Sequence, residues 1–524
     1  MPNYKKKKHH SQHKHGHQTK STKKDCENDD DTLQSGWSKL YEIKTSEMMG
    51  RYLVATKPIK PGDVLIEESP LVVGPPTEYG PVCLGCLKKV VFPQSQCKCP
   101  GCHWPICSQP CEKLNQDHGH TNFECNFLRE KNVVQFIEKY GDNDLKVAYE
   151  IIFPLRCLLL KLHDKSKWEQ LMEMEAHNDI RKNITWLWTR NQTRIVNRIR
   201  NEWKIDDFTE EEIHTVCGII EVNCFEVGHE GAKGRALYPT SFLMAHDCSS
   251  NSTHTDNPEN FSMQIRAMRD IKKGESITVN YGYILMGTLK RRERLNMGKF
   301  FWCACQRCSD PTEFGTYCSA LKCSSCSNGI LLSTNPLDQQ AEWKCLKCSH
   351  TIEAKHISSM LDKLFDQLDS IDPHDVKGQE MFIERYGNIL GSNHYLILSA
   401  KYDLCQLYGR AEDFLVDSLS EDLLKHKEDY CRDVLKVVKV LEPGLSRVKG
   451  IVMYELHVPL LLLAGQRLRK EQINKSEFMK CLKEVVSLLE ESSKILKMEP
   501  GQKEQEMAHG AEMALMTLKL QKLL

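Results

Sequence analysis

The sequence predicts a multi-domain protein of the α+β class, and three observations support this. The 524 residues exceed what one hydrophobic core serves, because a domain typically holds about 100–200 residues. Two segments, Gly50–Pro75 and Met263–Tyr281, combine the β-branched residues and turn signals of short strands. Each is followed by a cysteine-rich block, and beyond His356 the apolar spacing is that of helices.

Charge and hydropathy restrict the function classes. The formal net charge is zero, which argues against a general polyanion binder. Residues 1–35 form a Lys- and His-rich segment that turns acidic, and we predict a disordered tail. It is either a solvated tail or an arm for nuclear localisation or weak, non-specific nucleic-acid contact. No apolar stretch approaches the roughly 20 residues of a membrane helix, since the nearest, at Ile151, is interrupted by Pro154 and Arg156. We expect no membrane partner.

These features divide the chain into seven segments. Apolar residues recur on one face at Leu482, Val485, Val486 and Leu489, which favours an array of helical hairpins at the C-terminus. Trp186 and Trp188 are predicted to lie in a core. The segments are the tail (1–35), a first strand region (36–80), a cysteine block (81–126), a helical region (127–214), a second strand region (215–297), a second cysteine block (298–350) and a helical region (351–524).

The first cysteine block predicts two zinc sites. Close ligand pairs on turns each supply two corners of a tetrahedral site, and four such pairs fit two ions. Chance clustering of free cysteines is the alternative, and the histidine ligand is either His120 or His118. The pairs are Cys83-x2-Cys86, Cys99-x2-Cys102, Cys107-x3-Cys111 and His120-x4-Cys125.

The second block predicts further sites. Cys303, Cys305 and Cys308 provide three thiolates, so a fourth ligand from elsewhere is expected. Two Cys-x2-Cys pairs follow, and their separation is typical of a zinc ribbon, with a redox-active disulfide as the alternative. These pairs are Cys323 with Cys326 and Cys345 with Cys348.

The first block resembles a MYND finger. The segment "MAHDCSSNST" (Met244–Thr253), the strand ending "ITVNYGYILMGTLKRRERL" and the following Cys-x-Cys-x2-Cys cluster together resemble the SMYD family of SET and MYND domain lysine methyltransferases. The phrases "GRYLVATKPI" and "LEPGLSRVKGI" look like its arthropod-specific branch. The resemblance covers the chain from about Gly36 to the end. It implies a β-rich SET domain at 36–80 and 215–297, split by the finger and a helical insert, then a post-SET zinc site, the ribbon and a helical, TPR-like domain.

The resemblance also implies how the zinc ligands are grouped. In a MYND finger the pairs are interleaved, and Cys248 would complete the post-SET site. The implied sets are Cys83, Cys86, Cys107 and Cys111; Cys99, Cys102, His120 and Cys125; and Cys248, Cys303, Cys305 and Cys308.

The family motif Asn-His-Ser-Cys-x-Pro-Asn reads here Ala245-His246-Asp247-Cys248-Ser249-Ser250-Asn251. The resemblance implies that S-adenosylmethionine is the cofactor and that Tyr281 orients the reacting amine, where a strand-end tyrosine would otherwise be ordinary packing. Phe225 matches a wall of the lysine channel and Phe301 the residue covering the adenine. The implied cofactor residues are Gly50, Arg51, Asn223, Ala245, His246, Tyr281 and Phe301, and the implied channel residues are Tyr281, Phe225 and Lys299.

Three residues depart from the family pattern. Tyr52 stands where a glycine is usual, and Ala245 lacks the hydrogen-bonding amide of the usual asparagine. Lys299 replaces a second channel tyrosine, and its charge would oppose an entering ammonium unless it swings outward or loses its proton.

Two functions follow from the sequence. The first is an S-adenosylmethionine-dependent protein-lysine N-methyltransferase that acts on histone or other proteins in transcriptional regulation. The second is a catalytically weak or inactive scaffold that recruits partners for repression, with Pro-rich peptides as candidate MYND ligands. We expect a monomer found in nucleus and cytoplasm.

Overall fold

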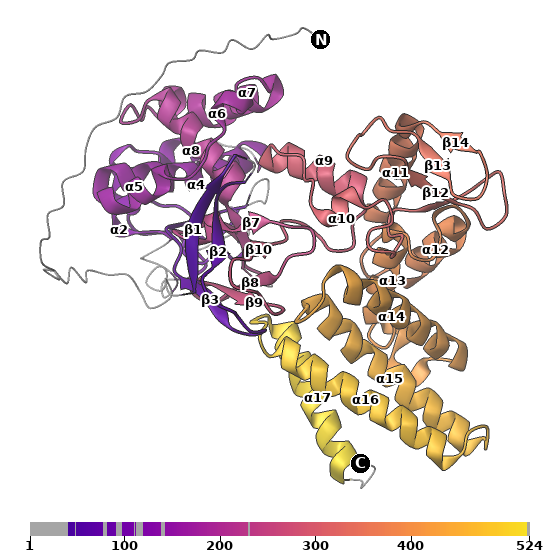
Figure 1. Cartoon of the computed structure of the whole chain (residues 1–524). Helices are drawn as coiled ribbons and strands as arrows, with labels where there is room; N and C mark the ends of the chain where they lie inside the picture. Colours follow the sequence, from indigo (N-terminus) through magenta and orange to yellow (C-terminus); the bar gives the residue numbers. More distant parts are fainter. Residues whose placement is uncertain are drawn as a thin grey trace, which may run out of the picture.

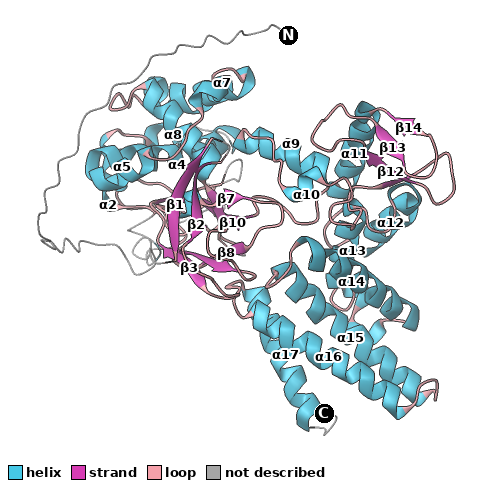
Figure 2. Ribbon diagram, in the orientation of Figure 1, coloured by secondary structure: helices cyan, strands magenta, loops and turns pink. Residues whose placement is uncertain are grey.

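The computed structural model describes residues 40–520 except 48, 77–80, 91–96, 109–110, 112–118, 138–141 and 229–230, and only the backbone of 136–137 and 142–145. The predicted tail and His118 therefore lie outside the described residues. The chain combines short β-sheets, a helical insert and a C-terminal helical array, which confirms the α+β class (Figures 1 and 2).

The β core consists of several small sheets rather than one large one. They are the hairpin β1-β2, two three-stranded antiparallel sheets in the orders β3-β9-β8 and β4-β6-β5, and the parallel pair β7-β10. In β9 side chains alternate between buried and half-buried, as a strand with one covered face requires. The strands are β1 Tyr41–Ser46, β2 Gly50–Ala55, β3 Val64–Glu68, β4 Val72–Gly74, β5 Phe225–Val227, β6 Gly234–Leu237, β7 Ala245–His246, β8 Ser252–Asp256, β9 Met263–Ala267 and β10 Thr278–Val279.

The parallel pair joins two segments that lie more than thirty residues apart in sequence. Thr278 pairs with Ala245 and Val279 with His246. The buried Asn251 holds these two segments together. Its side-chain Nδ2 donates to the Ser276 carbonyl at 2.8 Å, and its Oδ1 accepts the Thr278 N–H at 2.9 Å. The motif around His246 and the strand that leads to Tyr281 therefore lie side by side.

A helical insert packs on the β core. Its central helix, α4, runs through Pro154, and Ile151, Ile152 and Phe153 are fully buried. Trp186 is 62% exposed, so its predicted core position is wrong. The helices are α2 Asn122–Glu130, α3 Val134–Ile137, α4 Asp142–His163, α5 Lys165–Met172, α6 Asn178–Arg181, α7 Thr185–Asn191, π-helical Gln192–Val196 and Arg198–Glu202, and α8 Glu210–Asn223.

Helix α9 spans from the β core to a ribbon and the C-terminal helices (Figure 1). The ribbon is one antiparallel sheet in the order β11-β12-β13-β14. The elements are the 3₁₀ turn Ser241–Leu243, α9 Thr288–Lys299, α10 Gln306–Ser309, β11 Leu321–Lys322, β12 Ile330–Ser333, β13 Trp343–Cys345 and β14 Thr351–Ile352.

The C-terminal region is an array in which each of the helices α12 to α17 contacts the next, as helical hairpins require. Leu482, Val485 and Leu489 are buried and Val486 is half-buried, which confirms the predicted face. The helices are α11 Ala354–Asp369, α12 Val376–Leu390, α13 Tyr395–Leu407, 3₁₀ turns Glu412–Phe414 and Val416–Ser418, α14 Glu421–Leu441, α15 Arg447–Arg469, α16 Lys475–Leu496 and α17 Gln502–Leu520.

By length and composition, one helix of the described chain would reach across a bilayer. It is α15, not the predicted nearest segment at Ile151, which lies inside α4. Two thirds of the apolar window of α15 is buried, as in the core helix of an array.

Three predicted boundaries fall within helices. The boundary at 126/127 lies in α2, that at 214/215 in α8 and that at 297/298 in α9. Helices α8 and α9 each begin in one predicted segment and carry a candidate site residue at the far end, so the insert, the β core and the second cysteine block share rigid elements.

The helical array contacts the β core through the loop before α15. Leu445 N–H donates to the Met268 carbonyl at 3.0 Å. Gly444 has a φ of 101°, and a Cβ there would lie 2.1 Å from the same carbonyl oxygen. Only glycine permits this close approach.

Asp403 of α13 makes the stability of the helical array depend on pH. Burial raises its pKa from 3.8 to about 6, although Lys503 opposes the shift. The folded state therefore binds the proton more tightly than the unfolded state, and the stabilisation present below about pH 3.8 is lost as the pH rises through 6. We expect Asp403→Asn to raise the free energy of unfolding by about 1–3 kcal/mol at pH 8 and by little at pH 4. Urea midpoints followed by helical circular dichroism measure this, with the exposed Asp413→Asn as control; equal gains at both pH values would contradict it.

Candidate functional site

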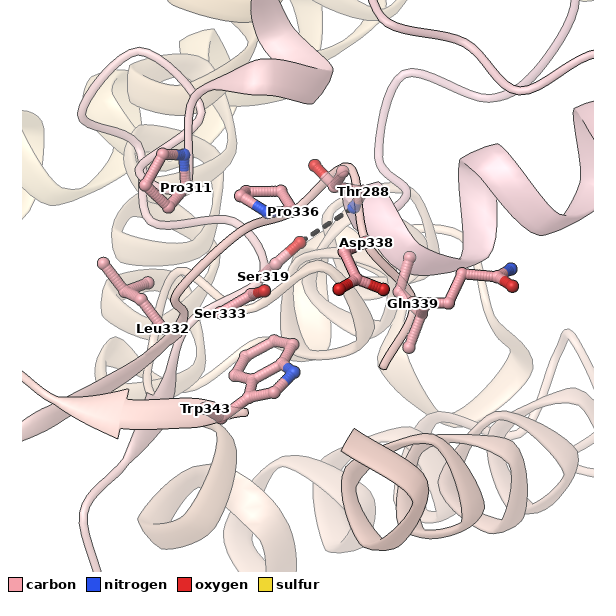
Figure 3. A pocket seen from close by; sticks show the side chains of 10 residues that line it. Thr288, Pro311, Ser319, Leu332, Ser333, Pro336, Asp338, Gln339 and Trp343 are labelled. Carbon is pink, nitrogen blue, oxygen red and sulfur yellow. Dashed lines mark hydrogen bonds between the residues drawn. The ribbon is translucent and has the colours of Figure 1, made fainter. Parts of the chain in front are cut away.

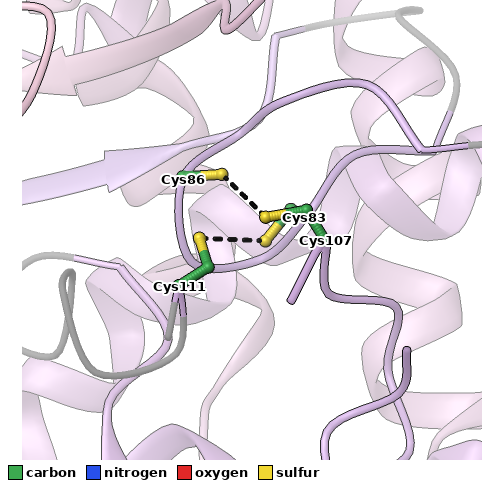
Figure 4. Close-up of side chains that lie close together, drawn as sticks. All are labelled: Cys83, Cys86, Cys107 and Cys111. Atoms are coloured by element: carbon green, nitrogen blue, oxygen red, sulfur yellow. Dashed lines mark hydrogen bonds between the residues drawn. The ribbon is translucent and has the colours of Figure 1, made fainter. Parts of the chain in front are cut away.

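The structure brings the sixteen predicted metal ligands together as four groups of four. Within each group all ligand atoms lie within 4.8 Å of one another. Figure 4 shows the four side chains of the first group pointing toward one another. The groups are Cys83, Cys86, Cys107 and Cys111; Cys99, Cys102, His120 and Cys125; Cys248, Cys303, Cys305 and Cys308; and Cys323, Cys326, Cys345 and Cys348.

The spacing of the sulfur atoms fits zinc. Tetrahedral zinc with Zn–S bonds of about 2.3 Å sets its sulfurs about 3.8 Å apart. The Sγ–Sγ distance is 3.6 Å between Cys83 and Cys111, 3.8 Å between Cys248 and Cys303, and 3.8 Å between Cys323 and Cys348. All these cysteines are free thiols. Each group could thus hold a metal ion, and its donor set is one that zinc prefers.

His120 belongs to the second group. Its Nε2 lies 3.4 Å from Cys102 Sγ, and its Nδ1 lies 3.0 Å from Glu124 Oε2. A carboxylate on the far nitrogen fixes the tautomer and orientation of a ligating histidine. Burial alone would raise the pKa of Glu124, but Arg156 and His120 lower it overall, so Glu124 is charged.

Arg156 connects the finger to the β core. Its guanidinium donates to Glu124 Oε1 at 3.1 Å, to the Val73 carbonyl of β4 at 2.8 Å and to the Leu84 carbonyl of the finger at 2.8 Å. The sequence analysis missed both Glu124 and Arg156, because a single charge within a helix carries no pattern. The one signal was Arg156 itself, a charged residue within the apolar run 151–160 of α4.

The third group is braced by buried charges. Arg291 donates to Cys248 Sγ at 3.2 Å and Cys308 Sγ at 3.4 Å, which suits thiolates. It also pairs with Glu313 at 2.8 Å, and Glu313 pairs with Arg307 at 2.9 Å. The two arginines lower the pKa of Glu313 to about 2 against the opposing effect of burial. These three residues were not predicted either.

His246 lies at the centre of the predicted methyl-transfer site. Its ring centroid is 5.1 Å from that of Tyr281 and 6.0 Å from that of Phe301. Nδ1 accepts the Tyr281 backbone N–H at 3.0 Å, so the proton is on Nε2, which faces Cys248 Sγ at 3.1 Å. Burial lowers the pKa of His246 to about 4, and the ring is neutral.

The Tyr281 hydroxyl is held in one orientation. It donates to the Met244 carbonyl, which leaves its lone pairs to accept a hydrogen bond. Desolvation raises the pKa of this hydroxyl, so it stays protonated. The side chain remains 38% exposed and thus accessible.

The other predicted cofactor residues and the channel residue Phe225 have separate local contacts. Gly50 has a φ of 63°, with open space where a Cβ would lie. Arg51 donates to the Glu173 carbonyl and lies 5.3 Å over the Phe242 ring. Asn223 donates to the Glu175 carbonyl at 2.8 Å. The ring centroid of Phe225 lies 5.2 Å from that of His254.

The three residues that depart from the family pattern lie in different surroundings. Tyr52 is half-buried in β2 opposite Lys44, and Ala245 lies in β7 opposite Thr278. Lys299, the last residue of α9, neither points to solvent nor forms an ion pair among the described residues. Its ammonium donates to the Val222 carbonyl at 2.6 Å and lies 5.6 Å from the Tyr281 ring centroid.

A separate hollow lies between the start of α9 and the ribbon. Figure 3 shows Trp343, Pro336 and Asp338 at its walls, and the Thr288 N–H donating to Ser319 Oγ at 2.9 Å. None of the predicted cofactor or channel residues lines it.

Comparison with known proteins identifies the β core. The model of the SET domain family matches residues 50–282, the span that holds the paired strands β7 and β10 and ends one residue after Tyr281. This span of the chain is similar to a SET domain. The SET match encloses the finger and the helical insert, as the resemblance implied.

Relatives confirm the similarity to the SMYD family at low identity. The "SET domain-containing protein SmydA-8, isoform A" of Drosophila melanogaster is 26% identical over 81% of this chain and 88% of its own. The mouse "Histone-lysine N-methyltransferase Smyd1" is 25% identical over 51% of this chain and 55% of its own. Among solved structures, the SET domain of LSMT bound to lysine and AdoHcy matches with a TM-score of 0.27 and 10% identity, over 80% of this chain and 88% of that chain.

The Glu124 carboxylate is expected to strengthen metal binding in the second group. In Glu124→Gln the partner of His120 is neutral, and we expect one zinc ion to be bound about 10–100-fold more weakly. Chelator-competition titration of the zinc-loaded protein measures this. Glu130→Gln changes an exposed residue of the same helix and should release zinc like the wild type. Equal release by both variants would show that Glu124 does not orient His120.

Proposed function

We propose that this protein is an S-adenosylmethionine-dependent protein-lysine N-methyltransferase that acts on histone or other protein lysines in transcriptional regulation. The observation that carries the proposal is the junction of β7 and β10 in a SET domain, where His246 holds the Tyr281 backbone and Phe301 lies alongside. The SET match and relatives named histone-lysine N-methyltransferases support it. Zinc in the four cysteine-rich groups is part of the proposal.

The residues of the site fit this chemistry. When bound, S-adenosylmethionine supplies an electrophilic methyl group that a neutral amine attacks in line. Tyr281, with its proton engaged by Met244, offers lone pairs to an N–H of the amine and so directs the nitrogen. The desolvated surroundings favour the neutral amine over the ammonium, because burial disfavours charge.

The cofactor side is formed by separate segments that meet here. β2, which carries Gly50 and Arg51, contacts β7, which carries Ala245 and His246. With no side chain within reach of Gly50, its backbone is open to approach by a ligand. The ring of Phe301 lies beside His246 and offers an apolar surface for an adenine.

A scaffold without catalysis is the second candidate, and three contacts favour it. The Asn223 and Arg51 side chains are engaged by backbone carbonyls of the insert, and the Lys299 ammonium lies at Tyr281. The four cysteine-rich groups, with zinc bound, would then stabilise a partner-binding surface rather than an active site. The test below separates the two functions at the level of cofactor binding.

We expect Tyr281→Phe to bind S-adenosylmethionine as the wild type does but to transfer methyl groups at least tenfold more slowly. Loss of the hydroxyl removes one hydrogen bond that orients the amine, and about 1.4 kcal/mol in the barrier is tenfold in rate. Calorimetric titration measures binding, and transfer of tritiated methyl to core histones measures the rate.

Tyr283→Phe is the matched control, because Tyr283 is 67% exposed two residues away and should change neither quantity. Transfer by Tyr281→Phe at the wild-type rate would remove Tyr281 from the mechanism. Failure of the wild-type protein to bind S-adenosylmethionine at millimolar concentration would favour the scaffold.

A further inference from the structure

Lys299 places a primary ammonium beside the ring of Tyr281. The residue ends α9, where this helix meets α8 (Figure 1). Its Nζ donates to the Val222 carbonyl at 2.6 Å and faces the Tyr281 ring at 5.6 Å from the centroid. Three segments that are remote in sequence thus converge on one ammonium group.

Two groups around this nitrogen attract a primary ammonium, against the opposing effect of burial. Val222 is the penultimate residue of α8, where carbonyls lack helical partners and the helix dipole is negative. An aromatic face adds a cation–π attraction. Glu226 and Cys224 lie close enough to favour the charged form, although burial lowers the pKa of Lys299 overall.

The hydrogen-bonding capacity of the Lys299 ammonium is only partly used. It has three N–H donors, but among the described residues its hydrogen-bond acceptor is the Val222 carbonyl alone, with no carboxylate at ion-pair distance. By contrast, Lys290 on the same helix pairs with both Glu293 and Asp362. A group held by one carbonyl and a ring face is displaced at lower cost than a fully paired one.

We propose that Lys299 is an internal occupant of the lysine-binding site, so that a substrate lysine reaches Tyr281 only after the Lys299 ammonium has left. This rests on the proposed function, because it takes Tyr281 as the residue that receives the substrate amine. Lys299 then determines specificity. A substrate is bound only if its other contacts offset the free energy of displacing Lys299. Its apparent affinity is the intrinsic affinity multiplied by the fraction of protein in which Lys299 has left the site.

The test replaces the ammonium while keeping the aliphatic stem. Lys299→Met is compared with Lys290→Met, which removes the same charge from the same helix away from Tyr281. Calorimetric titration with S-adenosylmethionine comes first, and all three proteins should bind it within about twofold. If the wild type and both variants fail to bind it, the proposed function fails, and this outcome is distinct from failure of the Lys299 proposal.

The decisive measurement uses n-butylamine, a mimic of the lysine side chain, titrated into cofactor-saturated protein and followed by saturation-transfer NMR. We expect Lys299→Met to bind the amine at least tenfold more tightly than the wild type and Lys290→Met, because an occupant present 90% of the time or more weakens binding about tenfold or more. Unchanged or weaker amine binding by Lys299→Met, with cofactor binding intact, overturns the proposal. It would make Lys299 a structural link between α8 and α9.

A second variant guards against misfolding. Lys299→Gln retains a donor for the Val222 carbonyl but carries no charge, so it preserves the link between the helices and should still gain amine affinity. A melting temperature lowered in Lys299→Met but not in Lys299→Gln, with the amine bound more tightly by Lys299→Gln, supports the proposal. Wild-type amine binding by Lys299→Gln contradicts it.

Discussion

The geometry of the candidate site depends on where the sulfur of Cys248 is held. This sulfur gathers with three cysteines that follow α9 and receives N–H groups from Arg291 and His246. Because His246 is thereby oriented, its Nδ1 is fixed as the acceptor for the Tyr281 backbone. A metal ion at this group would therefore hold two strands and one helix in register, and the position of the Tyr281 hydroxyl follows from it.

Buried charges extend this constraint to the rest of the molecule. Arg291, Glu313 and Arg307 are almost fully buried, and such charges persist only when each is paired and hydrogen-bonded. Glu313 also accepts from Ser319, which holds the first turn of α9 through Thr288. At the finger, Arg156 pairs with Glu124, and Glu124 in turn contacts His120. In both places an arginine–carboxylate pair stands behind a cysteine-rich group, so folding of the β core and metal binding are coupled.

The sequence predicted what has a local pattern and missed what has none. Ligand pairs two or three residues apart identify the finger and ribbon sites, since a turn brings them together. Cys248 lies 55 residues before Cys303, so it could be assigned to that site only through the family motif. The carboxylates Glu124 and Glu313 are single residues whose role comes from tertiary contacts. Trp186 was misplaced because helical periodicity indicates a face but not whether another element covers it.

Lys299 shows why a departure from a family pattern must be judged from its surroundings. By charge alone, a lysine in a channel for lysine should repel the substrate and vacate the site. Burial does oppose the charge and lowers the pKa of Lys299, but the end of α8, the Tyr281 face and nearby Glu226 each attract a cation. With a tyrosine at this position, these groups would be free to bind the substrate ammonium. With a lysine, they bind the ammonium of Lys299 instead. We therefore propose the ammonium site from the groups around Lys299 and not from the charge of this residue alone.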